Sequence, residues 1–592
     1  MPLNFLALFR ISLSVLIVFF TVSPIIASAN SVLDKATAQQ QLSDFIEKQL
    51  KSEDAEGLSI AIVHGSDSWF SAAYGLADAK LDKKASTQTQ YRIGSVSSLF
   101  TAMLILKLES ENKLSLDDKI SKYFPELPFA THDKQDYEIT IKQLLTHHSG
   151  LPLSVLKNSW AETPPRFTDI FHNDQPIYFS QAPDTIYTYS NVGYALLGML
   201  IEKLTGLTFE QAMTNYLLEP LGMQHTGFVS PSRQAENMSK GYKKGKEKKF
   251  LYPRDLPSLG MYSSARDMEI FLSYFLSSND DEKKILDNKQ IQKMLRIQNI
   301  HVAADLGKKV GLGWMIGSMA IENAGPIIWR GGASLYHRSR VVLLPKKNLG
   351  VVVFANDSGS WDLVESVATK ALTLALEVEY GIKQPDEKAE DKWVEPYGVS
   401  DDFAEHYNSF AGFIPVVQGR KSVKAELLGW TVIAKPDGRG WYKLQYDLFG
   451  IIPINLSWIT SVKVRPAKIS NYRVLIVLYQ GTQHLFASHI NIKHVDAAWR
   501  ARVGEYHLRN PDSLSEAMEI KTGKLMVEND QLFFLYQLPL FVGLELKVPI
   551  KILNKDEAII PGLGTALNET ISVKSIGNKE ILEYSGYQLE KK

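Results

Sequence analysis

Two pairs of strand-like segments that enclose a long, mostly helical stretch constrain the fold of the first two thirds of the chain more than any other feature. Residues 57 to 79 and residues 341 to 354 each contain two apolar runs separated by a short polar turn, a pattern typical of a β-hairpin. In the stretch between them, and again over residues 361 to 378, apolar side chains recur at helical spacing. This order predicts an α/β (α+β) domain over residues 30 to 382, with helices flanking one antiparallel sheet whose outer strands come from the two ends of the domain.

The composition changes at residues 383 to 393, where charged residues and a proline leave almost nothing to bury. We interpret this segment as a linker. After it, short strands alternate with Gly, Asn and Asp turns, which indicates an all-β region. Aromatic-glycine segments recur at Gly412 and Gly504, and they favour a duplication into two small barrels, residues 394 to 495 and 496 to 592. A single larger sandwich is the alternative.

Residues 1 to 29 have the pattern of a secretory signal peptide. Arg10 precedes an uncharged run, and the small residues Ala27 and Ala29 form the pattern that signal peptidase reads. This predicts cleavage after Ala29 and export to the periplasm or the medium. The uncharged run is nearly long enough to cross a bilayer, so an uncleaved anchor is the alternative. No later segment approaches a membrane-spanning length, and we expect no membrane contact beyond the signal segment.

The composition excludes several classes of function. The chain has 592 residues, of which 65 are basic and 65 acidic, so its formal net charge is zero. A neutral chain argues against nucleic acid as a partner. The absence of cysteine excludes disulfides, thiolate nucleophiles and cysteine-ligated metals. The 13 histidines show no spacing typical of metal ligands, and we expect neither a metal nor another cofactor.

Ser95 stands immediately before a predicted helix, where the helix dipole and the serine's own N–H favour a developing oxyanion. Alone, this position is equally typical of a helix N-cap. Four further blocks follow in order at residues 146 to 152, 187 to 194, 259 to 267 and 329 to 332. With these blocks, residues 57 to 356 resemble the serine β-lactamase and penicillin-recognising hydrolase superfamily. The resemblance is to the branch of class C β-lactamases, D-aminopeptidases and family VIII carboxylesterases.

The resemblance implies a role for each matching residue. Ser95 takes the nucleophile position of the Ser-x-x-Lys box and forms an acyl-enzyme. Tyr189 and Asn191 match Tyr-x-Asn, in which the phenol relays protons and the amide holds substrate.

The family's third box is usually Lys or His, any residue, then Gly. The segment Trp329-Arg330-Gly331 occupies it as substrate-binding residues, and Trp-x-Gly is similar to the variant of family VIII esterases. Gly332 is then the catalytic strand residue whose N–H completes the oxyanion hole beside that of Ser95. The trailing β regions resemble the lipocalin-like barrels of some D-aminopeptidase relatives.

One departure from the family puts turnover in doubt. The position of the box lysine is Ser98, so the amine that accepts the proton of the nucleophile is replaced by a hydroxyl. General-base assistance contributes roughly two to four orders of magnitude in rate. Arg330 and His337 are the candidates for a compensating charge, and the sequence leaves open whether either of them points inward.

Other candidates are weaker. Ser154 and Lys157 form a literal Ser-x-x-Lys, but they follow a predicted loop. His147 and His148 are more typical of structural or exposed residues than of catalytic ones. The basic run from residue 243 to residue 249 is typical of a solvated loop.

Two functions remain. The first is an exported serine hydrolase, an esterase or D-aminopeptidase-like enzyme, that acts on a small ester, an amide or a D-amino-acid peptide, including peptidoglycan peptides, with activity impaired by Ser98. The second is a catalytically inactive pseudoenzyme that binds cell-wall peptides or a partner protein.

Overall fold

The computed structural model describes residues 33 to 592 with short gaps. Left out of the description are residues 54, 173–175, 233, 234, 236, 278–284, 386–394, 396, 399–401, 449–451, 455–461, 480, 492, 493 and 538–544. The predicted signal segment and most of the predicted linker lie outside the described residues.

An eight-stranded sheet forms the centre of the first domain, in the order β13-β14-β15-β16-β17-β1-β2-β3. Its strands are β1 Gly57–His64, β2 Asp67–Asp78, β3 Lys83–Lys84, β13 Lys309–Val310, β14 Met315–Ile316, β15 Ile328–Ala333, β16 Arg338–Leu344 and β17 Leu349–Ala355. All neighbouring strands are antiparallel. β1 pairs with β17, with Ile60 opposite Val353, so the two ends of the domain meet inside the sheet. The predicted antiparallel sheet is confirmed.

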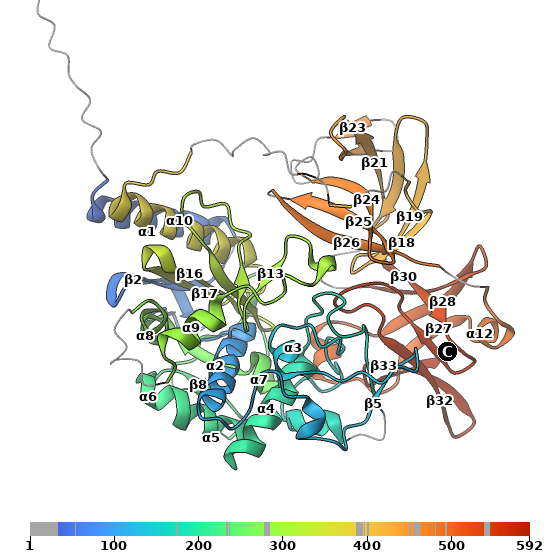
Figure 1. Ribbon diagram of the computed structural model, residues 1–592, viewed down its shortest axis with the longest axis horizontal. Coiled ribbons are helices and arrows are strands. Elements are labelled where there is room, and N and C mark those ends of the chain that lie inside the picture. The colour runs from blue at the N-terminus through green and yellow to red at the C-terminus, as the bar shows by residue number, and fades with distance from the viewer. Residues whose placement is uncertain are drawn as a thin grey trace, which may run out of the picture.

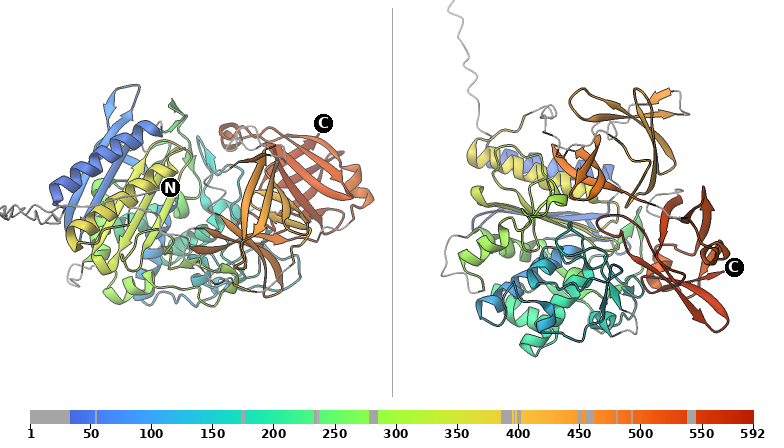
Figure 2. Two further views of the ribbon diagram at one scale, coloured as in Figure 1. Left: turned by 90° about the horizontal axis from the view of Figure 1, so that it is seen from above. Right: turned by 45° about the vertical axis from the view of Figure 1, so that its right-hand side comes forward.

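Helices cover both faces of this sheet because its central strands are apolar on both sides. On β1, Ile60 and Ile62 pack with α1 and α10, whereas Ala61 and Val63 pack with the larger helical layer. Figures 1 and 2 show α1 and α10 on one face, and α2, α4 and α8 on the other. The helices are α1 Lys35–Ser52, α2 Ser97–Ser110, α3 Ile141–Leu145, α4 Asn191–Thr205, α5 Phe209–Met213, α6 Glu219–Leu221, α7 Leu256–Leu259, α8 Ala265–Leu276, α9 Asn288–Leu295 and α10 Trp361–Tyr380.

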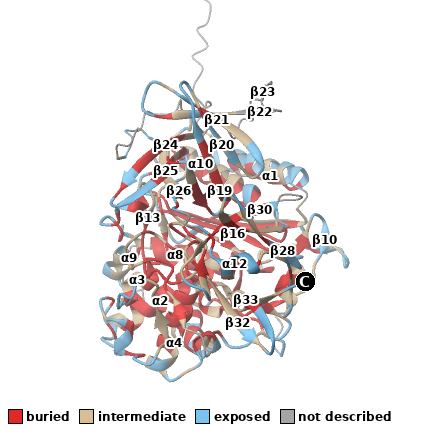
Figure 3. Cartoon of the chain, turned by 90° about the vertical axis from the view of Figure 1, so that its right-hand side faces the viewer, coloured by how far each residue is buried: buried red, intermediate tan, exposed pale blue. Residues whose placement is uncertain are grey.

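The larger helical layer surrounds α2, which is buried along nearly its whole length. Figure 3 shows this buried layer around α2 and α8. Beside it, β4 Gln90–Arg92, β12 Met261–Ser264 and β8 Gly227–Phe228 form a small sheet. β4 leads directly into the segment that carries Ser95, so the small sheet fixes the start of α2. Short two-stranded pairs complete the layer: β5 Phe129–Ala130 with β7 Ile177–Tyr178, β6 Trp160–Ala161 with β11 Tyr252–Pro253, and β9 Tyr242–Lys243 with β10 Lys246–Glu247.

Two closed β-barrels follow, as predicted. In the first, pairing of β21 with β22 closes the ring, and β23 is attached to β22. Its strands are β18 His406–Ser409, β19 Gly412–Gln418, β20 Val423–Leu427, β21 Trp430–Pro436, β22 Tyr442–Leu448, β23 Ile452–Ile454, β24 Lys463–Ile469, β25 Tyr472–Tyr479 and β26 Thr482–His489. Closure leaves each barrel without long free edges.

The second barrel contains eight strands in sequence order, β27 to β34. They are β27 Gly504–Leu508, β28 Thr522–Glu528, β29 Gln531–Gln537, β30 Glu545–Ile552, β31 Glu557–Ile559, β32 Thr570–Ile576, β33 Lys579–Tyr584 and β34 Tyr587–Lys591, with the short helices α12 Ala497–Ala501 and α13 Ser513–Ala517. Figure 1 shows both barrels on the same side of the first domain.

Within the described residues, no single helix is long and apolar enough to cross a membrane, and α4 together with Phe209–Leu221 reaches the required length only across a bend of 77°.

Candidate active site

Ser95 lies at the start of α2, beside the phenol of Tyr189. It is the middle residue of a 3₁₀ turn, Gly94–Val96, that leads directly into the helix. Gly94 has a φ of +52°, and a Cβ there would lie 2.4 Å from the backbone of Ala333, so this close approach requires glycine. The Tyr189 hydroxyl donates a hydrogen bond to Ser95 Oγ at 2.8 Å. The structure thus brings together the residues expected to act as nucleophile and proton relay.

The start of α4 places Tyr189 and Asn191. The Ser190 side chain caps the helix by accepting the N–H of Gly193 at 2.9 Å, so Tyr189 lies just before α4 and Asn191 is its first residue. Asn191 Oδ1 is buried and has no hydrogen-bond partner in the described part of the chain. A buried amide oxygen without a donor is costly, and an N–H group of a substrate can satisfy it.

His147 holds the backbone on both sides of Tyr189. Its carbonyl accepts the N–H of Thr188 at 2.8 Å, and its Nδ1 accepts the N–H of Ser190 at 3.1 Å. The imidazole lies 4.4 Å from the Tyr189 ring, centre to centre. Burial, with Arg330 as the next cause, lowers the pKa of His147 far below its usual value. The ring therefore stays neutral and positions Tyr189.

The hydroxyl at the lysine position points back at the nucleophile's own backbone. Ser98 is fully buried, and its Oγ donates to the carbonyl oxygen of Ser95 at 2.7 Å. This is a local helix contact, and it supplies no positive charge.

The Arg330 guanidinium, from the central sheet, is buried beside the same carbonyl oxygen of Ser95. Arg330 on β15 is only 4% exposed, and its Nε donates to the carbonyl oxygen of Ser95 at 3.2 Å. Its Cζ lies 5.5 Å from the centre of the Tyr189 ring. Burial works to lower the pKa of Arg330, but Tyr189, Tyr187 and Tyr194 together raise it above its usual value. The site therefore contains a permanent cation.

Comparison with known proteins identifies the family of the domain that carries this site. A family model described as Beta-lactamase matches residues 42–375, which is more than half of the chain. The chain belongs to the Beta-lactamase family. It is 30% identical over 343 residues to Protein flp of Staphylococcus aureus (strain NCTC 8325 / PS 47), a match that covers 56% of this chain and 66% of that protein. The match therefore spans just under two thirds of the relative's length.

Two further matches agree. A Beta-lactamase of Providencia stuartii is 32% identical over 252 residues, covering 41% of this chain and 61% of that protein. The crystal structure of SurE matches with a TM-score of 0.56 and 18% identity, covering 77% of this chain and 100% of that chain. This last likeness concerns the fold alone.

The structure corrects the register of the third box of the Beta-lactamase domain. Side chains alternate between the two faces of a strand, and Arg330 and Gly332 face the turn that carries Ser95. Trp329 faces the α10 side, where its Nε1 donates to the carbonyl of Gly317 at 2.6 Å. Gly331 faces Trp361 on that same side. Trp329 and Gly331 are therefore not placed to contact substrate, and the box is Arg330-Gly331-Gly332.

This register also changes the residue expected to donate the second hydrogen bond to the oxyanion, from Gly332 to Ala333. A Cβ on Gly332 would lie 2.0 Å from the carbonyl oxygen of Ile93, so the strand needs glycine here. Backbone N–H groups alternate between the edges of a strand, and that of Ser334 donates to His337 across the β15–β16 hairpin. The N–H of Gly332 is consequently directed toward Ser339 on β16, and that of Ala333 points away from β16. Sequence reasoning missed Ala333 because the box fits two registers.

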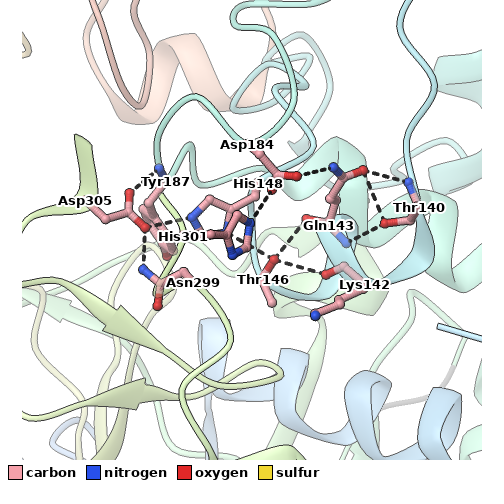
Figure 4. A network of polar contacts seen from close by, with 10 residues as sticks. All are labelled: Thr140, Lys142, Gln143, Thr146, His148, Asp184, Tyr187, Asn299, His301 and Asp305. Carbon is pink, nitrogen blue, oxygen red and sulfur yellow. Dashed lines mark hydrogen bonds and ion pairs between the residues drawn. The ribbon is translucent and has the colours of Figure 1, made fainter. Parts of the chain in front are cut away.

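His148 belongs to a buried network beside the site, which Figure 4 shows. Its Nε2 lies 2.8 Å from Asp305, and its Nδ1 lies 3.0 Å from the hydroxyl of Thr146. Asp305 also accepts the N–H of Tyr187 at 2.6 Å. The network therefore fixes the segment that leads to Tyr189, which is a structural role.

His337 is not the compensating cation. Its ring nitrogens contact the hydroxyl groups of Ser239 and Ser334. Burial, with Arg92 as the next cause, lowers the pKa of His337 to about 3, so the ring is neutral. Of the two candidates, Arg330 is the one beside Ser95.

The literal Ser-x-x-Lys of residues 154 to 157 lies at a domain boundary. Ser154 Oγ donates to Asp255 at 3.1 Å, and Lys157 Nζ donates to the carbonyl of Pro511 at 3.2 Å. Lys157 Nζ and the carbonyl of Ser154, which accepts from Ser585 Oγ at 2.9 Å, contact the second barrel, whereas the Ser154 hydroxyl stays within the Beta-lactamase domain.

The second barrel also reaches the site itself, because Thr565 Oγ1 accepts the N–H of Tyr189 at 2.9 Å. No sequence signal indicates a contact between residues so far apart. Within the described residues, no group of three or more His, Asp or Glu side chains is arranged to hold a metal.

Proposed function

We propose that this protein is a serine hydrolase that transfers an acyl group from a small ester or a D-amino-acid amide to Ser95 and then to water. The observation that supports it best is the 2.8 Å contact between Tyr189 Oη and Ser95 Oγ beside a buried guanidinium. Nucleophile and proton acceptor are within hydrogen-bond reach of each other, which is the first requirement for this chemistry.

In the proposed reaction, Tyr189 reacts as the phenolate after releasing its own proton to solvent, and it takes the Ser95 proton while Oγ bonds to the carbonyl carbon. The oxyanion that forms is stabilised by the N–H groups of Ser95 and Ala333. Its collapse breaks the bond to the leaving group, which takes the proton from Tyr189. Water then attacks the acyl-enzyme and regenerates the Ser95 hydroxyl. The Arg330 guanidinium supplies the positive charge that the missing lysine would have supplied, and it stabilises negative charge on the Tyr189 oxygen.

Export is part of this proposal, because peptidoglycan peptides lie outside the inner membrane. The signal-like pattern of residues 1 to 29, with Ala27 and Ala29, supports cleavage after Ala29.

Intact-mass measurement of the purified protein after exposure to a fluorophosphonate tests the proposal. We expect one adduct per chain, no adduct in Ser95→Ala, and an undiminished adduct in Ser154→Ala, since the Ser154 hydroxyl is bonded to Asp255 and its carbonyl to Ser585 of the second barrel. The mass of the unreacted protein reports whether the chain begins at Asn30. Absence of an adduct at large reagent excess would show that Ser95 is not activated.

A binding protein without turnover is the second candidate, and Ser98 at the lysine position favours it. If the cleft only binds, a muropeptide at 100 times its dissociation constant should stabilise the fold by about 2.7 kcal/mol, visible as a rise in Tm. Ser95→Ala should show the same rise. No rise with any muropeptide would remove this candidate.

A further inference from the structure

Both barrels and the Beta-lactamase domain meet at one loop, residues 561 to 568, which lies beside Tyr189. The carbonyl of Pro561 accepts from Asn408 Nδ2 of the first barrel at 2.7 Å. The carbonyl of Gly562 accepts from Gln181 Nε2 of the Beta-lactamase domain at 3.1 Å. With Thr565 bonded to the N–H of Tyr189, the loop is fixed at both neighbouring domains.

A shared hydrophobic cluster makes this junction rigid. Ile186 and Ala304 of the Beta-lactamase domain, Ile476 and Trp441 of the first barrel, and Leu563 of the loop pack together as buried residues. Contacts between buried apolar residues of three domains indicate a built interface rather than a passing contact. A cavity next to this cluster therefore has a defined shape.

Such a cavity, of about 350 Å³, opens at the junction. Its size is within the range of ligand sites in proteins. Tyr187, Lys308, Ala304, Phe486, Leu563 and Thr565 are among the residues that line it, so its walls are mostly apolar. Tyr187 and Thr565 place the cavity beside the site, because the first is two residues from Tyr189 and the second bonds to the N–H of Tyr189.

Lys308 is the cationic group of this cavity. Its Nζ lies 4.3 Å from the centre of the Tyr187 ring, and no hydrogen bond or ion pair joins it to another described residue. Burial lowers the pKa of this ammonium, and the charge of the Asp305 carboxylate in the same cavity works in the opposite direction. An ammonium carries three donors, and no described residue uses any of those of Lys308.

Among the described residues, the other titratable groups of the cavity form no hydrogen bond or ion pair with the Lys308 ammonium. Asp305 uses one oxygen for the N–H of Tyr187 and the other for His148 and Asn299. Burial, followed by the charge of Lys308, lowers the pKa of His484, so this ring is neutral. One available positive charge among apolar walls suits an organic group with a single negative charge, and a phosphate dianion would lack a second cation.

We propose that the three-domain cavity is a substrate subsite that receives an apolar group ending in a carboxylate, which the Lys308 ammonium binds. The subsite rests on the proposed function for its link to turnover, and it gives that function a substrate class: esters or amides that carry a free carboxylate. It also gives the barrels a role, because the Leu563 and Phe486 walls belong to them.

Equilibrium binding separates this proposal from catalysis. We would titrate the full-length protein with hexanoate and with hexanamide, which differ in charge but hardly in shape, by ligand-observed NMR. The expected result is at least tenfold tighter binding of hexanoate, because charge-assisted hydrogen bonds are the stronger ones. Lys308→Met should abolish this preference and Lys308→Arg should retain it. The matched control is Lys309→Met, which removes an exposed lysine at the neighbouring position and should change nothing.

Equal affinity for the two ligands, or an unchanged preference in Lys308→Met, would overturn the subsite. Lys308→Met is expected to fold, because it replaces an unpaired ammonium by an apolar side chain of similar length. The preference should persist in Ser95→Ala, since binding needs no nucleophile. A hexanoate preference without a fluorophosphonate adduct would therefore contradict the proposed function alone, and an adduct without the preference would contradict the subsite alone.

Discussion

Arg330→Met is expected to lower kcat/KM for an ester substrate by roughly two to four orders of magnitude, the usual contribution of general-base assistance. The guanidinium bonds to the carbonyl of Ser95 and lies over the Tyr189 ring, and its loss removes this positive charge from beside the Ser95 and Tyr189 oxygens. The loss should appear in kcat, with KM little changed, because Arg330 is buried behind the reacting groups. The rate constant of fluorophosphonate labelling should fall in parallel.

Stability distinguishes this loss from unfolding. Arg330 is buried among tyrosines rather than carboxylates, and replacing a buried charge by an apolar side chain is often neutral or stabilising. The Tm of Arg330→Met should therefore not fall. Arg330→Lys keeps the charge and should recover at least tenfold of the lost rate. A fully active Arg330→Met, or an equally inactive Arg330→Lys with an unchanged Tm, would contradict the electrostatic role.

The sequence predicted the parts of the site that depend on local pattern. Ser95 before a helix, and Tyr189 and Asn191 around the cap of another, are positions that helix signals and family motifs identify together. The hydrophobic pattern likewise predicted the antiparallel sheet and an all-β second part, because strand periodicity is local. The division into two barrels was predicted from the recurring aromatic-glycine segments at Gly412 and Gly504.

The site predictions that were wrong concern which side chains of a strand point toward the site. The run from Trp329 to Gly332 fits the third box in either of two registers, and a shift by one residue exchanges the faces of every side chain. Only the pairing of β15 with β16, and the approach of Gly332 to Ile93, decide that Arg330 points inward.

Contacts between segments far apart in the sequence could not be predicted from local sequence patterns. Thr565 reaches the N–H of Tyr189 across 376 positions of the chain, and Lys308 joins the cavity through packing of three domains. Neither residue belongs to a motif. Their place follows from how the barrels dock, which hydrophobic periodicity does not encode.

The contacts at the Ser95 carbonyl also predict how side chains at positions 98 and 330 affect each other. Ser98 Oγ and Arg330 Nε both donate to the carbonyl oxygen of Ser95, at 2.7 and 3.2 Å, so the two side chains converge on one atom. A lysine at position 98 would bring a second buried cation to a place that the guanidinium already occupies. Ser98→Lys alone should therefore lower Tm and give no gain in kcat/KM, since like charges in a buried site destabilise each other.

The double variant Ser98→Lys/Arg330→Met should behave differently. With the guanidinium removed, the new ammonium has room beside Ser95, and kcat/KM should exceed that of Arg330→Met by at least tenfold because an amine near the nucleophile is restored. Kinetics and melting of the four proteins form a double-mutant cycle, in which the coupling between the two positions is read directly. If Ser98→Lys alone raises kcat/KM tenfold with an unchanged Tm, the two positions are independent and Arg330 does not occupy the place of the lost lysine.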